Sequence, residues 1–214
     1  MTNPNIDTFT PSINKRVGEL SKLSELYGNF MRVERATYRD GRPETDGEHT
    51  LHAMFLAVAY TAKHHPEFNP GEVALLMMIH DLDEVYEGDV NSLTATDIDM
   101  KLKEDNEVKS RHQLRQELSA EPYILQLLER YWRQEEPIVK YVRTIEKLDP
   151  SFSHIKDGGQ SVRAMGVDTL GQFSELEERV VARMEGYGNE VAPDVVGLRR
   201  ILGRRVAEIT FDTV

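Results

Sequence analysis

The sequence predicts an all-α protein, a single-domain helical bundle of about seven or eight helices. Two observations carry this prediction. Apolar residues recur at spacings of three and four in several segments, and no segment sustains the alternating pattern of a half-buried strand. The chain has 214 residues, which is enough to bury one sizeable core, and it contains no repeat or clear linker. We therefore expect a flexible arm over residues 1–12 and one domain over residues 13–214.

Prolines and apolar spacing set the expected helix boundaries. Pro70, Pro122 and Pro137 each fit the first turn of a helix, where a missing amide hydrogen costs little. Pro150 should stop the helix that precedes it. The expected helices are residues 13–32, 46–63, 70–81, 97–118, 122–133, 137–149, 168–187 and 193–209. Loops are expected at residues 33–46, 91–94 and 151–166.

The helix expected over residues 46–63 has one apolar side. Its predicted buried stripe consists of Leu51, Phe55, Val58 and Ala59, with Met54 and Ala62 alongside. His64 and His65 follow the end of this helix, so we expect both on the surface.

The loop expected over residues 33–46 is locally basic. The residue pairs Asp40-Gly41 and Arg42-Pro43 are typical of loops. Four arginines lie in or beside it: Arg32, Arg35, Arg39 and Arg42. Each could pair with a nearby carboxylate in a solvated loop, or the loop could lie at the mouth of a site and bind phosphate. The sequence leaves both interpretations open.

Composition excludes several classes of protein. The net charge of -11 would repel duplex nucleic acid, whereas a small anionic substrate is compatible with a local basic patch or a metal. The absence of cysteine excludes disulfides, thiolate metal sites and cysteine nucleophiles. No apolar run approaches the roughly 20 residues of a membrane span, and the first residues do not look like a secretory signal. We therefore expect a cytoplasmic protein that binds neither membrane nor nucleic acid.

The most informative stretch joins an apolar run to ionisable residues. Residues 74–79 are strongly apolar, and His80, Asp81, Glu84 and Asp89 follow them. Carboxylates beside such a run need a cation or a donor, because an unpaired buried charge is expensive. Imidazole and carboxylate are ordinary ligands of transition metals. At helical spacing, Glu84 would share a face with the pair before it and could work beside a metal without binding it.

Two other segments complete a metal constellation. His49 opens one expected helix, and an acidic residue, Glu146 or Asp149, lies near the end of another. Helical bundles build metal sites from side chains of facing helices. Two histidines and two carboxylates would hold one divalent transition metal, with Zn, Mn, Co, Fe and Ni equally suited. Such a metal lowers the pKa of water and supplies hydroxide near neutral pH.

The order of these residues resembles a known family. His49, then His80-Asp81, then a late acidic residue is similar to the H…HD…D pattern of HD-domain metal-dependent phosphohydrolases. Three segments resemble one branch, the HD-domain 5'-deoxynucleotidases: RVERATYRDGRPETDGEH, HDLDEVYEGDV and VRTIEKLD. The resemblance covers residues 30–150 and implies an HD-type bundle with its metal site in that part of the chain.

The resemblance also implies roles for single residues. His49, His80 and Asp81 match metal ligands, and Glu84 matches the catalytic acid. Asp89 matches an acidic residue that positions substrate or water. Arg35 matches an arginine near the substrate phosphate, although a structural salt bridge is an equal alternative for it.

The last ligand departs from the family pattern. Glu146 stands where the family carries an aspartate, in the segment Glu146-Lys147-Leu148. Asp149 lies three residues further and is the alternative ligand.

The implied reaction is hydrolysis of a deoxyribonucleoside 5'-monophosphate to nucleoside and phosphate. The alternatives are a small HD-domain dNTP triphosphohydrolase, which would release triphosphate, and a non-catalytic nucleotide sensor that keeps the metal. A small-molecule nucleotide is the expected partner. The sequence leaves open whether the chain forms a homo-oligomer.

Overall fold

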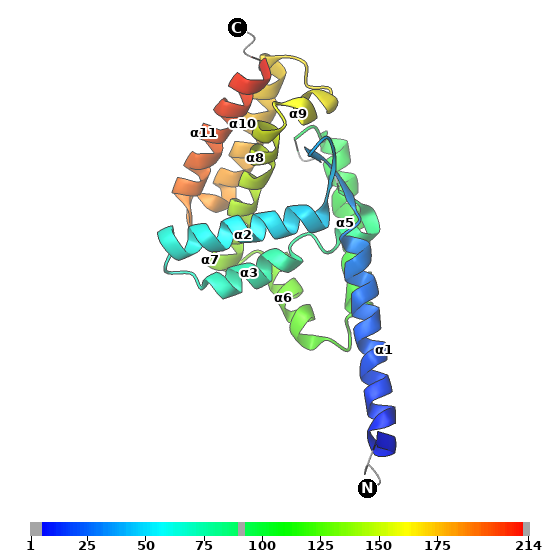
Figure 1. The fold of residues 1–214 in the computed structure, drawn as a ribbon. Coiled ribbons are helices and arrows are strands. Elements are labelled where there is room, and N and C mark those ends of the chain that lie inside the picture. Colours follow the sequence, from blue (N-terminus) through cyan, green and yellow to red (C-terminus); the bar gives the residue numbers. More distant parts are fainter. Residues whose placement is uncertain (1–5, 90–92, 212–214) are drawn as a thin grey trace.

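The structure, a computed structural model, describes residues 6–89 and 93–211 (Figure 1). The all-α prediction is confirmed, with one addition, a two-stranded hairpin. The elements are α1 (Ile6–Phe30), β1 (Glu34–Arg39), β2 (Arg42–Thr45), α2 (Asp46–His64), α3 (Pro70–Ile79), α4 (Glu84–Glu87), α5 (Asp97–Glu117), α6 (Pro122–Arg133), α7 (Pro137–Ile145), the 3-10 helix η1 (Glu146–Leu148), α8 (Asp149–Lys156), α9 (Gln160–Ala164), α10 (Leu170–Gly188) and α11 (Pro193–Phe211).

Helix α2 crosses the middle of the molecule, with α3 packed against it (Figure 1). Helices α8, α10 and α11 stand together on one side of α2, and α6 lies on the other. The main core includes the fully buried Phe30, Leu76, Met77, Leu128 and Tyr141. No helix in the described part of the chain combines the length and the apolar character needed to cross a bilayer.

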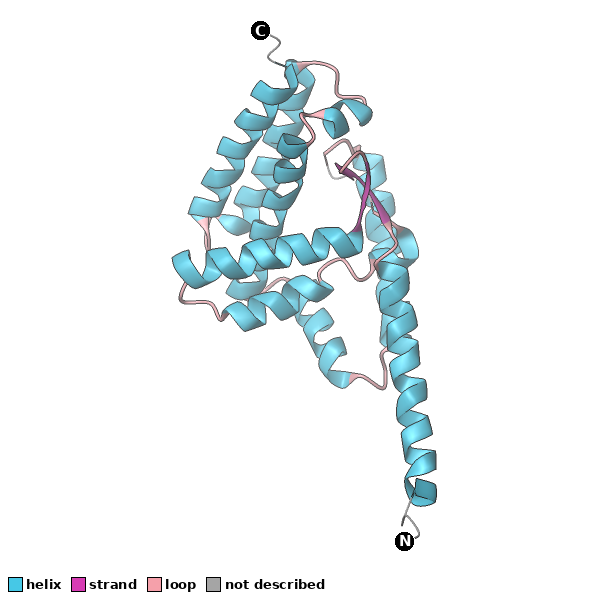
Figure 2. Cartoon of the chain, in the orientation of Figure 1, coloured by secondary structure: helices cyan, strands magenta, loops and turns pink. Residues whose placement is uncertain are grey.

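The segment over residues 33–46 is a hairpin, so the expected loop is wrong there (Figure 2). Asp40 and Gly41 both have positive φ, 53° and 82°, as a two-residue turn between antiparallel strands requires. The strands are short and their register shifts between Glu34 and Tyr38, which hides the alternation of a regular strand. β2 runs directly into α2, because Thr45 caps that helix in a capping box with Glu48.

The chain stays helical from α7 through η1 into α8, so Pro150 does not stop a helix as predicted. It lies in the first turn of α8 instead, where proline is tolerated. Most of the loop expected over residues 151–166 is helical, in α8 and α9, and a turn at 157–159 separates these two helices. Gly158 and Gly159 adopt positive φ in that turn.

At its start, α1 includes residues 6–12, a segment that we expected in a flexible arm. Residues 1–5 of that arm lie outside the described residues, as do residues 91 and 92 of the expected loop over 91–94.

The predicted buried stripe of α2 is wrong. Leu51 and Phe55 are 63% and 73% exposed, whereas Ala53, Ala57 and Thr61 are buried on the same face as His49. Small side chains on that face let α2 approach α3 closely, so residue size and not hydrophobicity alone selected the buried side.

His65 is also buried, contrary to prediction, while His64 is exposed. The ring of His65 bonds Asp194 at 3.1 Å and Glu67 at 2.9 Å. These contacts tie the end of α2 to the start of α11.

Candidate metal centre and active site

His49 lies in the first turn of α2 with its ring fully buried. Its Nδ1 atom is 2.7 Å from Oδ2 of Asp149. Hydrogen bonds from His49 and His52 outweigh the effect of burial and hold the pKa of Asp149 below its usual range, so this carboxylate is ionised. An ionised carboxylate only accepts hydrogen bonds, so Nδ1 of His49 donates. In the neutral ring, Nε2 then carries a free lone pair.

His80 ends α3 and is oriented in the same way. Its Nδ1 atom donates to the carbonyl oxygen of Met77 at 2.7 Å, which again leaves Nε2 without a proton in the neutral ring. The Nε2 atoms of His80 and His49 are 3.3 Å apart. Oδ2 of Asp81 lies 2.9 Å from the first and 3.7 Å from the second.

Two lone pairs that face each other cannot form a hydrogen bond, so this arrangement needs a cation. One answer is a proton on His80: burial opposes it, but Asp81 raises the pKa of His80 above its ordinary value. The other is a divalent metal, which accepts both lone pairs and pairs with Asp81. His49, His80 and Asp81 therefore fit a metal, as the sequence predicts.

The two candidates for the last ligand lie on different sides of this group. Glu146 in η1 lines the same cavity as His80 and Asp81, and Oε1 of Glu146 accepts from Nζ of Lys147 at 2.7 Å. Asp149 bonds the outward nitrogen of His49 and also contacts His52. That position suits a carboxylate that orients a histidine ligand from behind.

Glu84 begins α4 next to this group and is buried. One carboxylate oxygen accepts from Nζ of Lys103, on α5, at 3.2 Å. The other lies 3.7 Å from Nη1 of Arg35. Burial, and then the charge of Asp81, raise the pKa of Glu84 well above its ordinary value. This direction favours the protonated carboxyl, the form that a general acid needs.

Arg35 of β1 lies among four carboxylates. Its Nη1 atom is 2.7 Å from Asp46, 3.2 Å from Asp81, 3.7 Å from Glu84 and 3.9 Å from Asp89. These neighbours raise the pKa of Arg35 although burial opposes its charge. The hairpin thus brings Arg35 into the site. Its ion pairs there agree with the alternative in which Arg35 forms structural salt bridges.

Asp89 is held by the same hairpin. Its Oδ2 atom accepts from the backbone amide of Ala36 at 3.2 Å. Burial raises the pKa of the neighbouring Asp46 to about 6, although Arg35 opposes this rise.

The other arginines of the basic segment point to other partners. Arg39 pairs with Glu44 and also lies 3.8 Å from Oδ2 of Asp149, whereas Arg42 pairs with Glu48 on the surface. Arg32 is exposed and contacts Asn29. The contacts of Arg39 and Arg42 match the interpretation in which these arginines pair with carboxylates.

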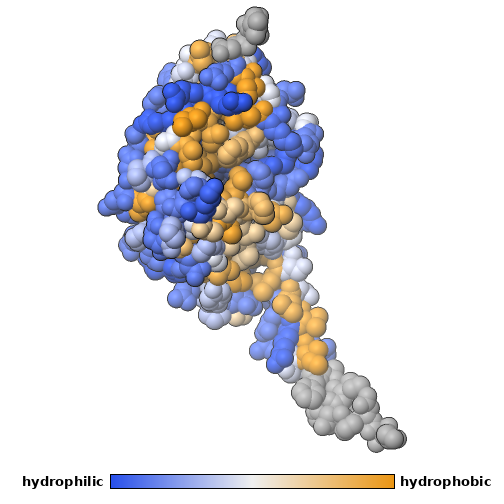
Figure 3. Space-filling view, turned by 60° about the vertical axis from the view of Figure 1, so that its left-hand side comes forward, coloured by the Kyte–Doolittle hydropathy of each residue, from blue (hydrophilic) through white to orange (hydrophobic). Residues whose placement is uncertain are grey.

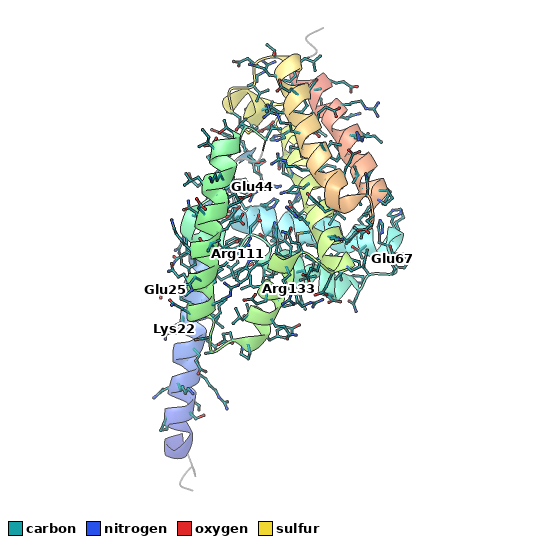
Figure 4. The ribbon with its side chains drawn as sticks, turned by 180° about the vertical axis from the view of Figure 1, so that it is seen from behind. Lys22, Glu25, Glu44, Glu67, Arg111 and Arg133 are labelled. Carbon is teal, nitrogen blue, oxygen red and sulfur yellow. The ribbon has the colours of Figure 1, made fainter. Side chains whose placement is uncertain are left out.

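A cavity of about 350 Å³ opens beside the candidate metal site. Among its lining residues, His80, Asp81, Glu84 and Glu146 come from the site itself. Five cationic side chains also line it: Lys103 and Arg111 of α5, Arg143 of α7, Lys147 of η1 and Arg183 of α10. Figure 4 labels Arg111 on α5.

Sequence reasoning missed most of these cations. Lys147, adjacent to Glu146, carried a local signal. The other four lie on α5, α7 and α10, and the spacing of apolar residues in these helices does not indicate which side faces the cavity. Asp46 was also missed as the partner of Arg35, because the hairpin that brings them together was expected to be a loop. Asp149 was missed as the partner of His49, because the two residues are 100 positions apart in sequence.

Comparison with known proteins places the chain in a family. Residues 28–186 match the HD domain, so the chain belongs to the HD-domain family, as its motifs predicted. No curated protein matches the chain.

Two solved structures share its fold. A predicted metal-dependent phosphohydrolase from Magnetospirillum magnetotacticum MS-1 aligns with a TM-score of 0.69 at 19% identity, over 90% of this chain and 95% of that one. A conserved hypothetical protein from Pyrococcus furiosus aligns with a TM-score of 0.54 at 16% identity, over 85% of this chain and 99% of that one.

Proposed function

We propose that this protein is a metal-dependent phosphohydrolase that converts deoxyribonucleoside 5'-monophosphates to nucleosides and phosphate. The observation that carries the proposal is the pair of Nε2 atoms of His49 and His80, which face each other 3.3 Å apart beside Asp81. Membership of the HD-domain family supports it, as does the fold shared with a predicted metal-dependent phosphohydrolase. The choice of a monophosphate rests on the resemblance of residues 30–150 to HD-domain 5'-deoxynucleotidases.

His49, His80, Asp81 and Glu146 would hold one divalent transition metal ion, with Asp149 in the supporting position behind His49. When bound, such an ion polarises a phosphate ester and makes hydroxide available near neutral pH. The nitrogen and oxygen ligands suit Zn, Mn, Co, Fe or Ni.

Glu84 would donate its proton to the 5' oxygen that leaves the phosphorus. Burial and the charge of Asp81 raise the pKa of Glu84 and so favour its protonated form before the reaction. Afterwards, Lys103 at 3.2 Å and Arg35 at 3.7 Å stabilise the carboxylate that remains. Asp89 and Asp46 hold Arg35 in place through their ion pairs with it. Arg143, which lines the cavity, would neutralise the substrate phosphate.

A second candidate function is a small dNTP triphosphohydrolase. The five cations around the cavity favour it, since a triphosphate carries more charge than one phosphate group. Several of these cations already have acidic partners: Lys103 pairs with Glu84, Arg111 with Asp83, and Lys147 with Glu146. We therefore prefer the monophosphate.

Product analysis tests this choice. Purified protein is incubated with dAMP and with dATP in the presence of Mn, Co or Zn, and the released phosphate species are identified. Release of phosphate from dAMP supports the proposal. Triphosphate from dATP, with dAMP untouched, would promote the second candidate. Nucleotide binding without turnover of either compound would identify a sensor.

A further inference from the structure

Gln134 follows the last residue of α6 and has a left-handed backbone, with φ of 55° and ψ of 28°. Within the described residues, Asp40 is the one other residue besides glycines with positive φ. This conformation is costly for a residue with a side chain, and glycine is the usual residue just after a helix that ends in this way. Gln134 therefore lowers the stability of the fold, and strained residues of this kind cluster at functional sites.

The side chain of Gln134 holds Arg143 of α7. Its Oε1 atom accepts a hydrogen bond from Nη1 of Arg143. A guanidinium donates hydrogen bonds and accepts none, so the oxygen of the amide faces it. The guanidinium also lies over the ring of Tyr187 of α10, 4.3 Å from the ring centroid. Contacts from two separate elements thus fix the direction of Arg143.

Both of these partners of Arg143 are uncharged. Three other cations that line the same cavity have carboxylate partners: Lys103 pairs with Glu84, Arg111 with Asp83, and Lys147 with Glu146. Over residues 6–89 and 93–211, Arg143 forms no ion pair with a carboxylate. Its charge is therefore held in place without being cancelled by an adjacent anion.

The surroundings of Arg143 suit a charged ligand. Gln134, Arg143 and Tyr187 line the cavity of about 350 Å³ beside the candidate metal site, and most of its other lining residues are charged or polar. Exposed apolar surface gathers elsewhere, for example along one side of α1 in the view of Figure 3. A half-buried guanidinium with neutral partners attracts an anion, and it forms its strongest hydrogen bonds to carboxylate or phosphate oxygens.

We infer that Gln134 is a positioning residue for substrate binding, which holds Arg143 in the cavity wall and leaves the charge of that arginine available to the substrate phosphate. The inference rests on the proposed function. A neutral acceptor is what this role requires. A carboxylate at position 134 would hold the guanidinium but cancel its charge, whereas glycine would relieve the backbone strain but release the guanidinium.

Gln134→Gly separates this role from a role in folding. Its melting temperature should equal or exceed that of the wild type, because glycine relieves the left-handed backbone and offsets the lost hydrogen bond. The dissociation constant of inorganic phosphate, titrated calorimetrically into metal-loaded protein, should rise at least about tenfold. The KM for dAMP should rise by a similar factor while kcat changes less than about twofold, as expected when ground-state binding is lost.

Gln134→Glu tests whether the neutral amide matters. This variant keeps an acceptor for Arg143 but adds a negative charge, so phosphate affinity should fall as in Gln134→Gly. A structural role alone would instead be preserved by the glutamate. The matched control is Asp40→Gly, which relieves a left-handed backbone in the exposed hairpin turn and should leave phosphate affinity and KM unchanged.

The titration distinguishes this inference from the proposed function. Phosphate binding that weakens in both Gln134 variants, in a protein that does not hydrolyse dAMP, would support the role of Gln134 while the proposed function fails. Equal phosphate affinity in wild type and Gln134→Gly would overturn the inference even if dAMP is hydrolysed. A wild type that binds no phosphate, or a Gln134→Glu variant with full phosphate affinity, would also overturn it.

Discussion

Oδ2 of Asp149 lies 2.7 Å from Nδ1 of His49, on the opposite side of the ring from the nitrogen that faces His80. A carboxylate in this position fixes the tautomer and the direction of a histidine ligand without touching the metal. Glu146, three residues earlier, lines the cavity with His80 and Asp81. We therefore predict separable roles for the two acidic residues.

Glu146→Gln and Asp149→Asn should weaken metal binding in different ways. Glu146→Gln removes the charge of the proposed fourth ligand, so the dialysed protein should contain clearly less metal. Asp149→Asn should lower metal affinity by about 10–100-fold, the usual effect of a lost supporting carboxylate, and excess metal should restore one equivalent. Metal analysis and calorimetric titration measure both. Full metal content in Glu146→Gln, together with loss in Asp149→Asn that excess metal does not restore, would make Asp149 the ligand.

Glu84→Gln should slow turnover by about 10²–10⁴-fold, the usual contribution of a general acid. The change keeps the size of the side chain but removes the acidic proton, so the fold and the bound metal should persist. Initial rates with dAMP or dATP and metal analysis of the same sample check this. Glu104→Gln is the control, because Glu104 lines the same cavity but is exposed. Equal rates in the two variants would assign the proton to another group, with Asp89 next.

Arg35→Met should destabilise the protein by about 3–5 kcal/mol, because it leaves buried carboxylates without their cation. Asp46 and Asp89 would lose the partner that lies 2.7 and 3.9 Å away. Urea unfolding measures the change. Arg42→Met, which breaks an exposed pair with Glu48, should change stability little. An unaltered unfolding curve for Arg35→Met, combined with weaker substrate binding, would show that Arg35 serves the substrate phosphate and not the fold.

The pH dependence of stability should change in Glu87→Gln. Burial, and then Asp83, raise the pKa of Glu87 from 4.5 to about 7 in the folded protein. Because the folded pKa is the higher one, the protonated carboxyl favours the folded state below about pH 4.5, and this contribution is lost as pH rises through 7. Glutamine resembles the protonated form, so the variant should gain stability relative to wild type across that range. Thermal melts of both proteins from pH 4 to 8 test this. A difference in stability between variant and wild type that does not change with pH would contradict the prediction.

The centre of the site was predictable because its chemistry is concentrated in short segments. His80, Asp81 and Glu84 lie within five residues, directly after an apolar run beside which carboxylates need a cation or a donor. The role of His49 as a metal ligand was predicted from the order of the motifs along the chain. The structure brings these residues together, but the ligand set itself stays a prediction until metal is measured.

The residues around the site could not be predicted from the spacing of apolar residues along the chain. Lys103 reaches Glu84 because α5 packs on α4, a contact that no local pattern indicates. The buried face of α2 was misassigned because Ala53 and Ala57 pack closely while Leu51 and Phe55 stay in water. The hairpin was missed because its strands are short and their register is irregular.

The unbroken helical path from α7 through η1 to α8 has a consequence for how this protein can evolve. Each residue of a helix turns the chain by about 100°, so the number of residues sets the direction of every later side chain. Removing one residue between Glu146 and Asp149 would turn Asp149 away from His49 and rotate all of α8 with it. Among related sequences, this stretch should accept replacements of side chains but no insertion or deletion.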